Sequence, residues 1–151
     1  EKVYLAVVEG SPAAPEWVCR LPLGSHPDQR GRMRVDARNG KAAETQFRVL
    51  RQAGGRTLLE ARPLTGRTHQ IRVHLAEARL PIVGDPLYGG RQPVAGAKPA
   101  GRRGEPEGGR FVMGLRAIKL AYVDPFTRRP VEIRAPVEEF LRAYGFAGVE
   151  V

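Results

Sequence analysis

Cysteine is almost absent from this chain, since Cys19 is the only one among 151 residues. A single cysteine cannot form a disulfide within the chain, and it excludes a zinc site built from several cysteines. No apolar run is long enough to cross a bilayer, and the first residues do not have the pattern of a signal peptide. We therefore expect a cytoplasmic protein with no membrane partner.

Histidine and serine are also scarce. His69 and His74 are five residues apart, about 140° around a helix, so they cannot chelate one ion as a pair spaced by four residues would. His26 lies in a separate predicted loop. Ser11 and Ser25 are the only serines, and neither lies in a nucleophile elbow. The sequence predicts no metal site and no serine hydrolase.

Lysine is rare as well, although the formal net charge is +9. Arginine therefore supplies most of the positive charge. Guanidinium groups bind phosphate bidentately and stack on bases, so this charge favours an RNA partner. A GC-rich genome would also enrich arginine, together with alanine, glycine and proline. That alternative stays open for the arginine excess, but it does not explain the high net charge.

Short apolar and alternating runs predict a sheet in the first half of the chain. The expected strands cover residues 3–9, 18–21, 33–37, 43–51 and 57–64, and residues 23–31 form a polar loop. Asn39-Gly40 predicts a hairpin that pairs 33–37 with 43–51, and Gly54-Gly55 predicts the next turn. The strands are expected to form an antiparallel meander.

A helix is expected over residues 68–79. Thr68 is a plausible N-cap. Ile71, Leu75 and Ala78 have helical spacing and are expected to face the core. Arg72 and Arg79 would lie on a neighbouring face, separated by a small alanine.

Cationic and polar side chains cluster where this helix begins: Arg67, Thr68, His69 and Arg72. The start of a helix carries free N–H groups and partial positive charge, so cations there are unfavourable unless an anion joins them. The cluster therefore indicates a polyanion or a carboxylate as partner.

The second half begins with residues 92–110, which are rich in Pro, Gly, Ala and Arg and predict a flexible loop. It is either a tolerated insertion or a loop that contacts RNA. Residues 111–123 and 131–134 predict a hairpin turned at Asp124-Pro125, and a final helix is expected from Pro136 to Tyr144. The expected fold class is α+β, with a mixed, mostly antiparallel sheet and a few packed helices.

Three segments of the chain resemble the RluA-like family of RNA pseudouridine synthases. They are residues 2–6 (KVYLA), residues 66–90 (GRTHQIRVHLAEARLPIVGDPLYGG) and residues 115–136, with its DPFT and closing AP motifs. Their order and spacing match the C-terminal part of the family's catalytic domain. The resemblance implies a pseudouridine synthase fold, here incomplete, over residues 1–151.

The resemblance also implies an activity. Family members flip a uridine out of rRNA or tRNA, cut its glycosidic bond, turn the base and rejoin it through C5, with no cofactor. The family's catalytic tyrosine corresponds to Tyr4, which lies against the base, and its catalytic arginine to Arg72, which pairs with the catalytic aspartate. Ile71 would line the base pocket. From the residues alone, a core tyrosine on a strand is the alternative for Tyr4, and a solvated helix arginine is the alternative for Arg72.

The remaining site residues are expected to bind RNA rather than to react: Lys2, Arg67, Thr68, His69 and Arg79. Asp85 is expected to bind its own backbone in a turn, and Tyr88 to pack beside it.

The family's aspartate nucleophile lies in an HRLD-type motif that these residues do not contain. We expect that the chain is a fragment and that the isolated chain is inactive. If these residues were the whole protein, Arg72 would point toward a carboxylate that is absent. A non-catalytic RNA-binding module is the alternative, and a basic surface that assembles with another protein is a third.

Overall fold

The computed structural model describes residues 1–89 and 113–151. In chain order its elements are β1 (Lys2–Glu9), β2 (Glu16–Cys19), β3 (Leu23–Ser25), β4 (Met33–Val35), β5 (Thr45–Ala53), β6 (Arg56–Pro63), α1 (Gln70–Glu77), β7 (Leu115–Val123), β8 (Pro130–Arg134) and α2 (Glu138–Ala143). The expected α+β class is confirmed. The loop expected over residues 92–110 lies outside the described residues.

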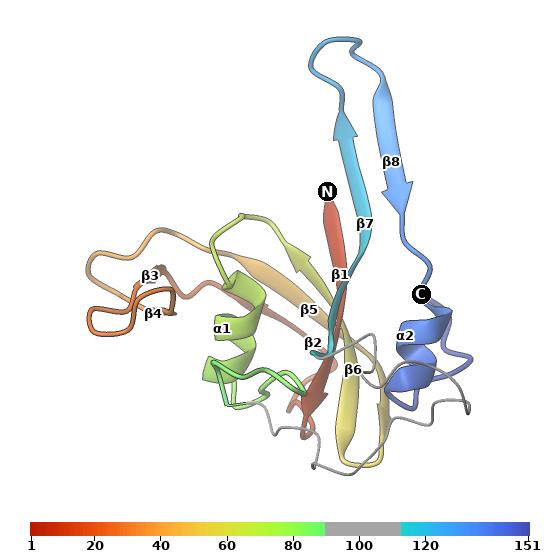
Figure 1. The fold of residues 1–151 in the computed structure, drawn as a ribbon, viewed down its shortest axis with the longest axis horizontal. Helices are drawn as coiled ribbons and strands as arrows, with labels where there is room; N and C mark the ends of the chain where they lie inside the picture. The colour runs from red at the N-terminus through yellow and green to blue at the C-terminus, as the bar shows by residue number, and fades with distance from the viewer. Residues whose placement is uncertain (90–112) are drawn as a thin grey trace.

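Six strands form one sheet in the order β2-β5-β6-β1-β7-β8, and every described pairing is antiparallel (Figure 1). The expected meander is wrong, because β1 lies in the middle of the sheet, between β6 and β7, and because β3 and β4 form a separate two-stranded sheet. The consecutive apolar residues of β1 suit this place, since a central strand covered on both faces is buried on both.

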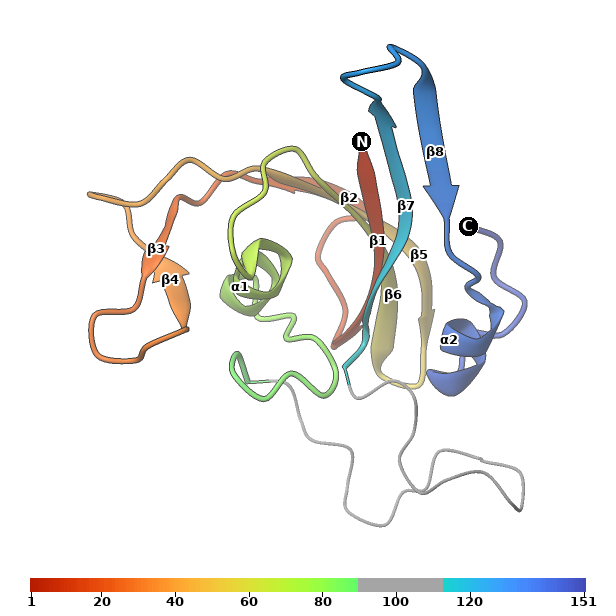
Figure 2. The ribbon, with the colours of Figure 1, turned by 45° about the horizontal axis from the view of Figure 1, so that its top comes forward.

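Each face of the sheet is covered by one helix, so β1 contributes side chains to two cores (Figures 1 and 2). Val8 packs in a cluster with Leu75 of α1, whereas Val7 packs in a cluster with Phe140 and Leu141 of α2. Because successive side chains of a strand point to opposite faces, these contacts place α1 and α2 on opposite sides of the sheet.

The hairpin predicted from Asn39-Gly40 is wrong. Strand β4 pairs with β3, which forms within the expected polar loop, while β5 pairs with β2 and β6. The Asn39-Gly40 turn does form, because Asp36 Oδ1 accepts the backbone N–H of Asn39 at 2.9 Å. It returns the chain to Leu23, which bridges Lys41, and not to β4.

Helix α1 is shorter than expected at both ends. Its N-cap is His69, with φ of 54° and no capping side chain, so the expected role of Thr68 as N-cap is wrong. At the other end, Arg79 N–H bonds to Ala76 O at 3.0 Å and Leu80 N–H to Leu75 O at 2.9 Å. These two bonds form a Schellman motif that ends the helix before residue 79.

Because α1 ends at Glu77, the buried and exposed faces of the helix differ from those expected. Ile71 and Leu75 are buried as predicted, but Ala78 is exposed because it lies at the C-cap. Arg79 follows the helix in a left-handed conformation, with φ of 59°. Arg72 and Arg79 therefore do not share one helical face.

Residues 113–151 agree closely with the elements expected from the sequence. Strands β7 and β8 form the expected hairpin, and Asp124 Oδ1 accepts the N–H groups of Phe126 and Thr127, each at 2.8 Å, in its turn. Helix α2 buries Phe140 and Leu141. In the part of the chain that the structure describes, no helix is both long and apolar enough to cross a membrane.

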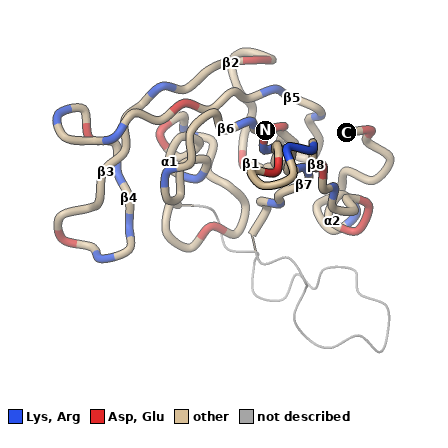
Figure 3. The backbone as a smooth tube through the Cα atoms, turned by 90° about the horizontal axis from the view of Figure 1, so that it is seen from above, with Lys and Arg blue, Asp and Glu red and all other residues tan. Residues whose placement is uncertain are grey.

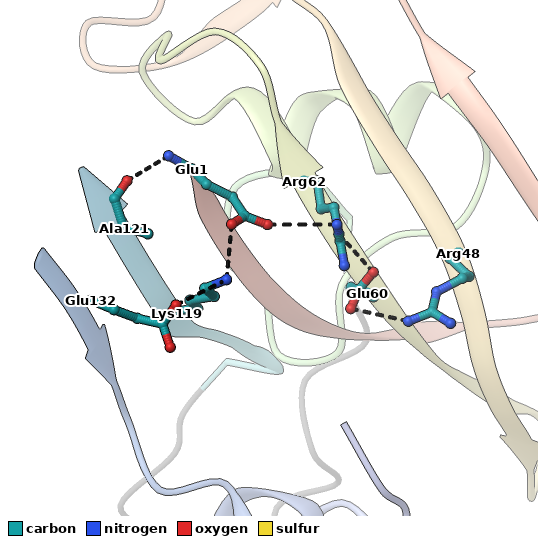
Figure 4. Close-up of polar contacts among 7 residues, drawn as sticks. All are labelled: Glu1, Arg48, Glu60, Arg62, Lys119, Ala121 and Glu132. Atoms are coloured by element: carbon teal, nitrogen blue, oxygen red, sulfur yellow. Dashed lines mark hydrogen bonds and ion pairs between the residues drawn. The ribbon is translucent and has the colours of Figure 1, made fainter. Parts of the chain in front are cut away.

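A ladder of charges crosses the sheet on the side of α2 (Figure 4). Its side chains alternate in sign and come from strands β5, β6, β7 and β8 and from the N-terminus: Arg48, Glu60, Arg62, Glu1, Lys119 and Glu132. The closest contacts are Arg62 to Glu60 and Lys119 to Glu1, both at 2.9 Å. The ladder covers a part of the sheet with paired charges.

Candidate functional site

The loop between β6 and α1 is held by the side chain of Gln70. This amide is buried, and its Nε2 donates to Glu44 O and to Thr45 Oγ1, both at 2.9 Å. Its Oε1 accepts from Thr65 Oγ1 at 2.7 Å and from Arg67 N at 3.0 Å. A buried amide with its hydrogen bonds satisfied fixes the backbone around it, so residues 65–70 have a defined path.

His74 continues this network into the core. Burial lowers the pKa of His74, so the ring is neutral at pH 7. Its Nε2 lies 2.9 Å from Leu21 O and donates to that carbonyl, which leaves Nδ1 to accept from Thr45 Oγ1 at 2.9 Å. His74 is thus a structural residue and does not face His69.

Arg72 forms a buried bidentate ion pair with Asp85. Its Nε lies 2.8 Å from Oδ2 and its Nη2 lies 2.7 Å from Oδ1. Only 12% of the Arg72 side chain and 1% of the Asp85 side chain are exposed. The expectation that Arg72 lacks a carboxylate within this chain is therefore wrong.

The contacts in this ion pair favour the charged form of Arg72 and the charged form of Asp85. Burial alone would raise the pKa of Asp85, but hydrogen bonds from Arg72 and from the N–H groups of Leu87 and Tyr88 lower it overall. The hydrogen bond to Asp85 raises the pKa of Arg72. Asp85 is the turn residue that we expected, and it also orients the guanidinium. Among the described residues, Nη1 of Arg72 has no hydrogen-bond partner and remains available.

Tyr88 joins this pair to two other segments. The Arg72 guanidinium lies 4.9 Å from the centre of the Tyr88 ring. The Tyr88 hydroxyl accepts from Met33 N of β4 at 2.9 Å and lies 2.9 Å from His69 Nδ1. Burial, followed by the charge of Arg72, lowers the pKa of His69. Tyr88 packs in the core as expected, and its hydroxyl contacts both Met33 and His69.

Tyr4 and Ile71 lie on the same side of the sheet as α1. Ile71 is buried in the cluster of that side, and the half-buried Tyr4 packs against this cluster. No hydrogen bond joins Tyr4 to Arg72 in the described part of the chain. The structure thus places Tyr4 and Ile71 on the same side of the sheet and in the same apolar cluster, and it brings Arg72 together with Asp85, Tyr88 and His69.

A basic groove lies between the β3–β4 hairpin and the end of α1, where Lys and Arg positions recur in Figure 3. It is lined by His26, Arg32, Met33, Arg34, Val73, Ala76, Glu77, Arg79 and Tyr88. Arg34 lies 3.6 Å from Asp36, whereas Arg32 bonds to the neutral Gln29 at 2.7 Å. Arg79 has no ion-pair partner among residues 1–89 and 113–151. Within residues 1–89 and 113–151, the guanidinium groups of Arg32 and Arg79 therefore have no carboxylate partner.

The other expected RNA-binding residues are exposed. Arg67 is anchored by a 2.9 Å hydrogen bond from its Nε to Ala42 O, and Thr68 follows it in the same loop. Lys2 lies exposed at the start of β1. The described residues hold no cluster of three His, Cys, Asp or Glu side chains that could bind a metal ion.

Sequence reasoning missed three functions of side chains in this region. The amide of Gln70 holds the loop before α1, Asp85 binds Arg72, and the hydroxyl of Tyr88 contacts Met33 and His69. Asp85 and Tyr88 lie in a turn signal, GDPLYGG, that predicts local contacts. Their pairing with Arg72 depends on how this turn folds back onto α1, which the spacing alone does not encode.

Comparison with known proteins matches the chain to one family. The family model described as RNA pseudouridylate synthase matches residues 1–77. The chain is 38% identical over 139 residues to "Ribosomal large subunit pseudouridine synthase D" of Xanthomonas campestris pv. campestris, which covers 92% of this chain and 41% of that protein. It is 36% identical over 141 residues to synthase C of Vibrio cholerae, which covers 93% and 42%. The chain thus spans less than half the length of these relatives.

Two solved structures share the fold. Human RNA Pseudouridylate Synthase Domain Containing 1 has a TM-score of 0.67 at 28% identity and covers 89% of this chain and 54% of that chain. Human RNA Pseudouridylate Synthase Domain Containing 4 has a TM-score of 0.68, covers 99% of this chain and 63% of that chain, and at 23% identity shows the fold alone.

Proposed function

Because the chain belongs to the RNA pseudouridylate synthase family, we propose that it supplies part of the active site of an enzyme that isomerises uridine to pseudouridine in rRNA or tRNA. In this reaction the bond from C1′ to N1 breaks, the base turns, and a bond from C1′ to C5 forms. The C5 proton is then lost and N1 is protonated, so the reaction is balanced without a cofactor.

The observation that carries the proposal is the way in which the guanidinium of Arg72 is held. Asp85 holds its Nε and Nη2 in a fixed plane, and Nη1 remains available to a second carboxylate. In the proposed site this second carboxylate is the nucleophilic aspartate, which Arg72 would keep ionised and oriented. The 151 residues have no HRLD-type motif, so the aspartate comes from outside them.

Tyr4 is the second catalytic residue in this proposal. It is half-buried and packs against the apolar cluster that contains Ile71, so an inserted base could stack on its ring, and a phenol can take part in removing the C5 proton. Ile71 supplies an apolar wall for the base. Tyr4 and Arg72 project from the sheet and from the helix that covers it, which is the side on which we place the base.

The RNA backbone would follow the exposed basic groups. Arg32 and Arg79 in the groove have no carboxylate partner in the described part of the chain, and Arg67, Thr68 and His69 lie at the start of α1. Lys2 is exposed at the start of β1, the strand that carries Tyr4. Phosphate contacts of this kind position an RNA without reading its sequence.

The test uses an rRNA transcript labelled with tritium at C5 of uridine. The isolated chain is expected to release no tritium, because it lacks the nucleophile. A chimera in which this chain replaces the matching part of the Xanthomonas campestris synthase D is expected to release it. In the chimera, Tyr4→Phe and Arg72→Lys should each lower the rate by roughly 100-fold or more, whereas Tyr122→Phe, at an exposed tyrosine, should not.

Two results would contradict the proposal. Release of tritium by the isolated chain would show that the nucleophile lies within these residues. A chimera that folds and binds the transcript but keeps its full rate after both substitutions would remove Tyr4 and Arg72 from the reaction.

A further inference from the structure

Tyr88 contacts two other segments of the chain, residues 32–33 and residues 69–72. Its ring lies 4.9 Å from the guanidinium of Arg72 in α1 and 5.6 Å from that of Arg32 beside β4. Its hydroxyl accepts from Met33 N and lies 2.9 Å from His69 Nδ1. Tyr88 is 8% exposed, and the two contacts of its hydroxyl are partly buried.

The hydroxyl of Tyr88 has a defined direction. Met33 N–H occupies an acceptor position on Oη, and His69 is a neutral ring beside the Arg72 cation. With Met33 N–H donating to Oη, the Tyr88 O–H can donate to Nδ1, and in that arrangement the proton of His69 is on Nε2. Tyr88 would then select one tautomer of His69.

His69 also has an unusual backbone. Its φ of 54° is left-handed, which favours glycine and costs a residue with a Cβ free energy. A conformation of this kind persists only where surrounding contacts hold it, and the hydrogen bond from Tyr88 is such a contact. The same conformation sets the direction in which residues 66–68 enter α1.

We propose that Tyr88 is a positioning residue that fixes His69 through its hydroxyl and Arg72 through its ring, and so holds the basic groove and Arg72 in one relative geometry. The groove is walled by Arg32 and Met33, and Met33 N–H is bound to the same hydroxyl that holds His69. A phenylalanine would fill the same space and stack on Arg72. The hydroxyl is therefore explained by His69 and Met33, and not by packing.

The effect of Tyr88 on catalysis rests on the proposed function, whereas its contacts with His69, Met33 and Arg72 do not. We therefore test it first on the isolated chain by NMR, with Tyr88→Phe as the variant and Tyr122→Phe as the matched control. In the wild type, His69 is expected as the Nε2–H tautomer. In Tyr88→Phe, the two ring nitrogen shifts of His69 should move toward each other, and the Met33 amide should exchange about tenfold faster. The control should match the wild type.

A second variant separates the ring from the hydroxyl. Tyr88→Leu removes both, so the Nε–H of Arg72 should exchange faster, whereas Tyr88→Phe should leave it protected. If Tyr88→Leu fails to fold, the Tyr88→Phe comparison still decides the question. Wild-type signals of His69 and Met33 in Tyr88→Phe would overturn the proposal, because packing alone would then account for Tyr88.

Turnover by the chimera gives the second readout. Tyr88→Phe is expected to raise KM about tenfold with kcat changed less than twofold, because the ring still stacks on Arg72 while His69 and the groove lose the hydroxyl. A folded Tyr88→Leu, which also loses the ring, is expected to lower kcat, and an unchanged kcat in that variant would overturn the link to Arg72. If the wild-type chimera itself is inactive, the proposed function fails while the NMR result on the isolated chain still stands.

Discussion

At the scale of single residues, Asp85 illustrates how one carboxylate can serve both a turn and a site. Its Oδ1 accepts the N–H groups of Leu87 at 2.9 Å and Tyr88 at 3.2 Å, which closes the turn. Both of its oxygens also bind Arg72. An arginine at the start of a helix interacts unfavourably with the positive end of the helix dipole, and the buried carboxylate of Asp85 offsets this effect.

We predict that Asp85→Asn destabilises the fold at pH 7 by about 3–5 kcal/mol, because it leaves Arg72 as a buried charge without its partner. Urea denaturation measures the change. The matched control is Asp124→Asn, since Asp124 closes a similar turn without a cation and its substitution should change stability little. Equal losses at the two positions would show that the turn, and not the ion pair, accounts for the effect.

The pH dependence of the stability that this ion pair contributes follows from the direction of the pKa shift of Asp85. The folded state lowers the pKa of Asp85 below its unfolded value of about 3.9. The pair therefore stabilises the protein above that value, and this stability is lost as the pH falls through the lower, folded pKa. The stability difference between wild type and Asp85→Asn should consequently shrink in acid.

At the scale of elements, α1 is positioned by its two ends. Its first turn is set by Gln70 and His69, and its last by the Schellman motif at Arg79. Both terminal residues, His69 and Arg79, have positive φ without being glycine. Neither end has the residue that helix-capping statistics favour, which is why the expected bounds of 68–79 were too wide.

We predict that Arg79→Gly stabilises the chain by about 1 kcal/mol, because glycine relieves the left-handed conformation, and also weakens RNA binding. Arg128→Gly is the matched control, since Arg128 has φ of 58° but lies in the turn between β7 and β8. Thermal unfolding should show a gain for both variants, and only Arg79→Gly should lower the affinity measured by fluorescence anisotropy. Equal affinities would exclude Arg79 from the RNA surface.

At the scale of the whole molecule, the distribution of charge separates two surfaces. The ladder beside α2 pairs its arginines and lysine with glutamates (Figure 4), whereas the groove beside α1 keeps Arg32 and Arg79 without carboxylate partners in the described part of the chain. The two surfaces therefore differ in how their described positive charges are paired.

We predict that RNA binding weakens steeply with salt. For single-stranded RNA, each neutralised phosphate contributes about −0.7 to the slope of log K against log salt concentration. Arg32→Gln and Arg79→Gln should each make the slope shallower by about that amount, while Arg129→Gln in the turn between β7 and β8 should not. Binding that does not depend on salt would instead favour a surface for protein assembly.

Several parts of the fold were predictable because short-range physics sets them. The continuous apolar run of β1, the Gly54-Gly55 turn and the hairpin turned at Asp124 follow from periodicity and turn chemistry, and the structure confirms them. The pairing of β3 with β4 was not predictable, since β3 has three residues with a glycine in the middle and no alternating pattern.

The sequence by itself determined the α+β class, the excess of arginine and the family, because composition, periodicity and three motifs are carried by neighbouring residues. The tertiary structure decided which carboxylate meets Arg72, what the hydroxyl of Tyr88 binds, and which arginines remain unpaired. Those contacts join residues separated by 13 to 55 positions along the chain. A contact at that separation exists only once the turn after α1 and the β3–β4 hairpin have packed against the same helix.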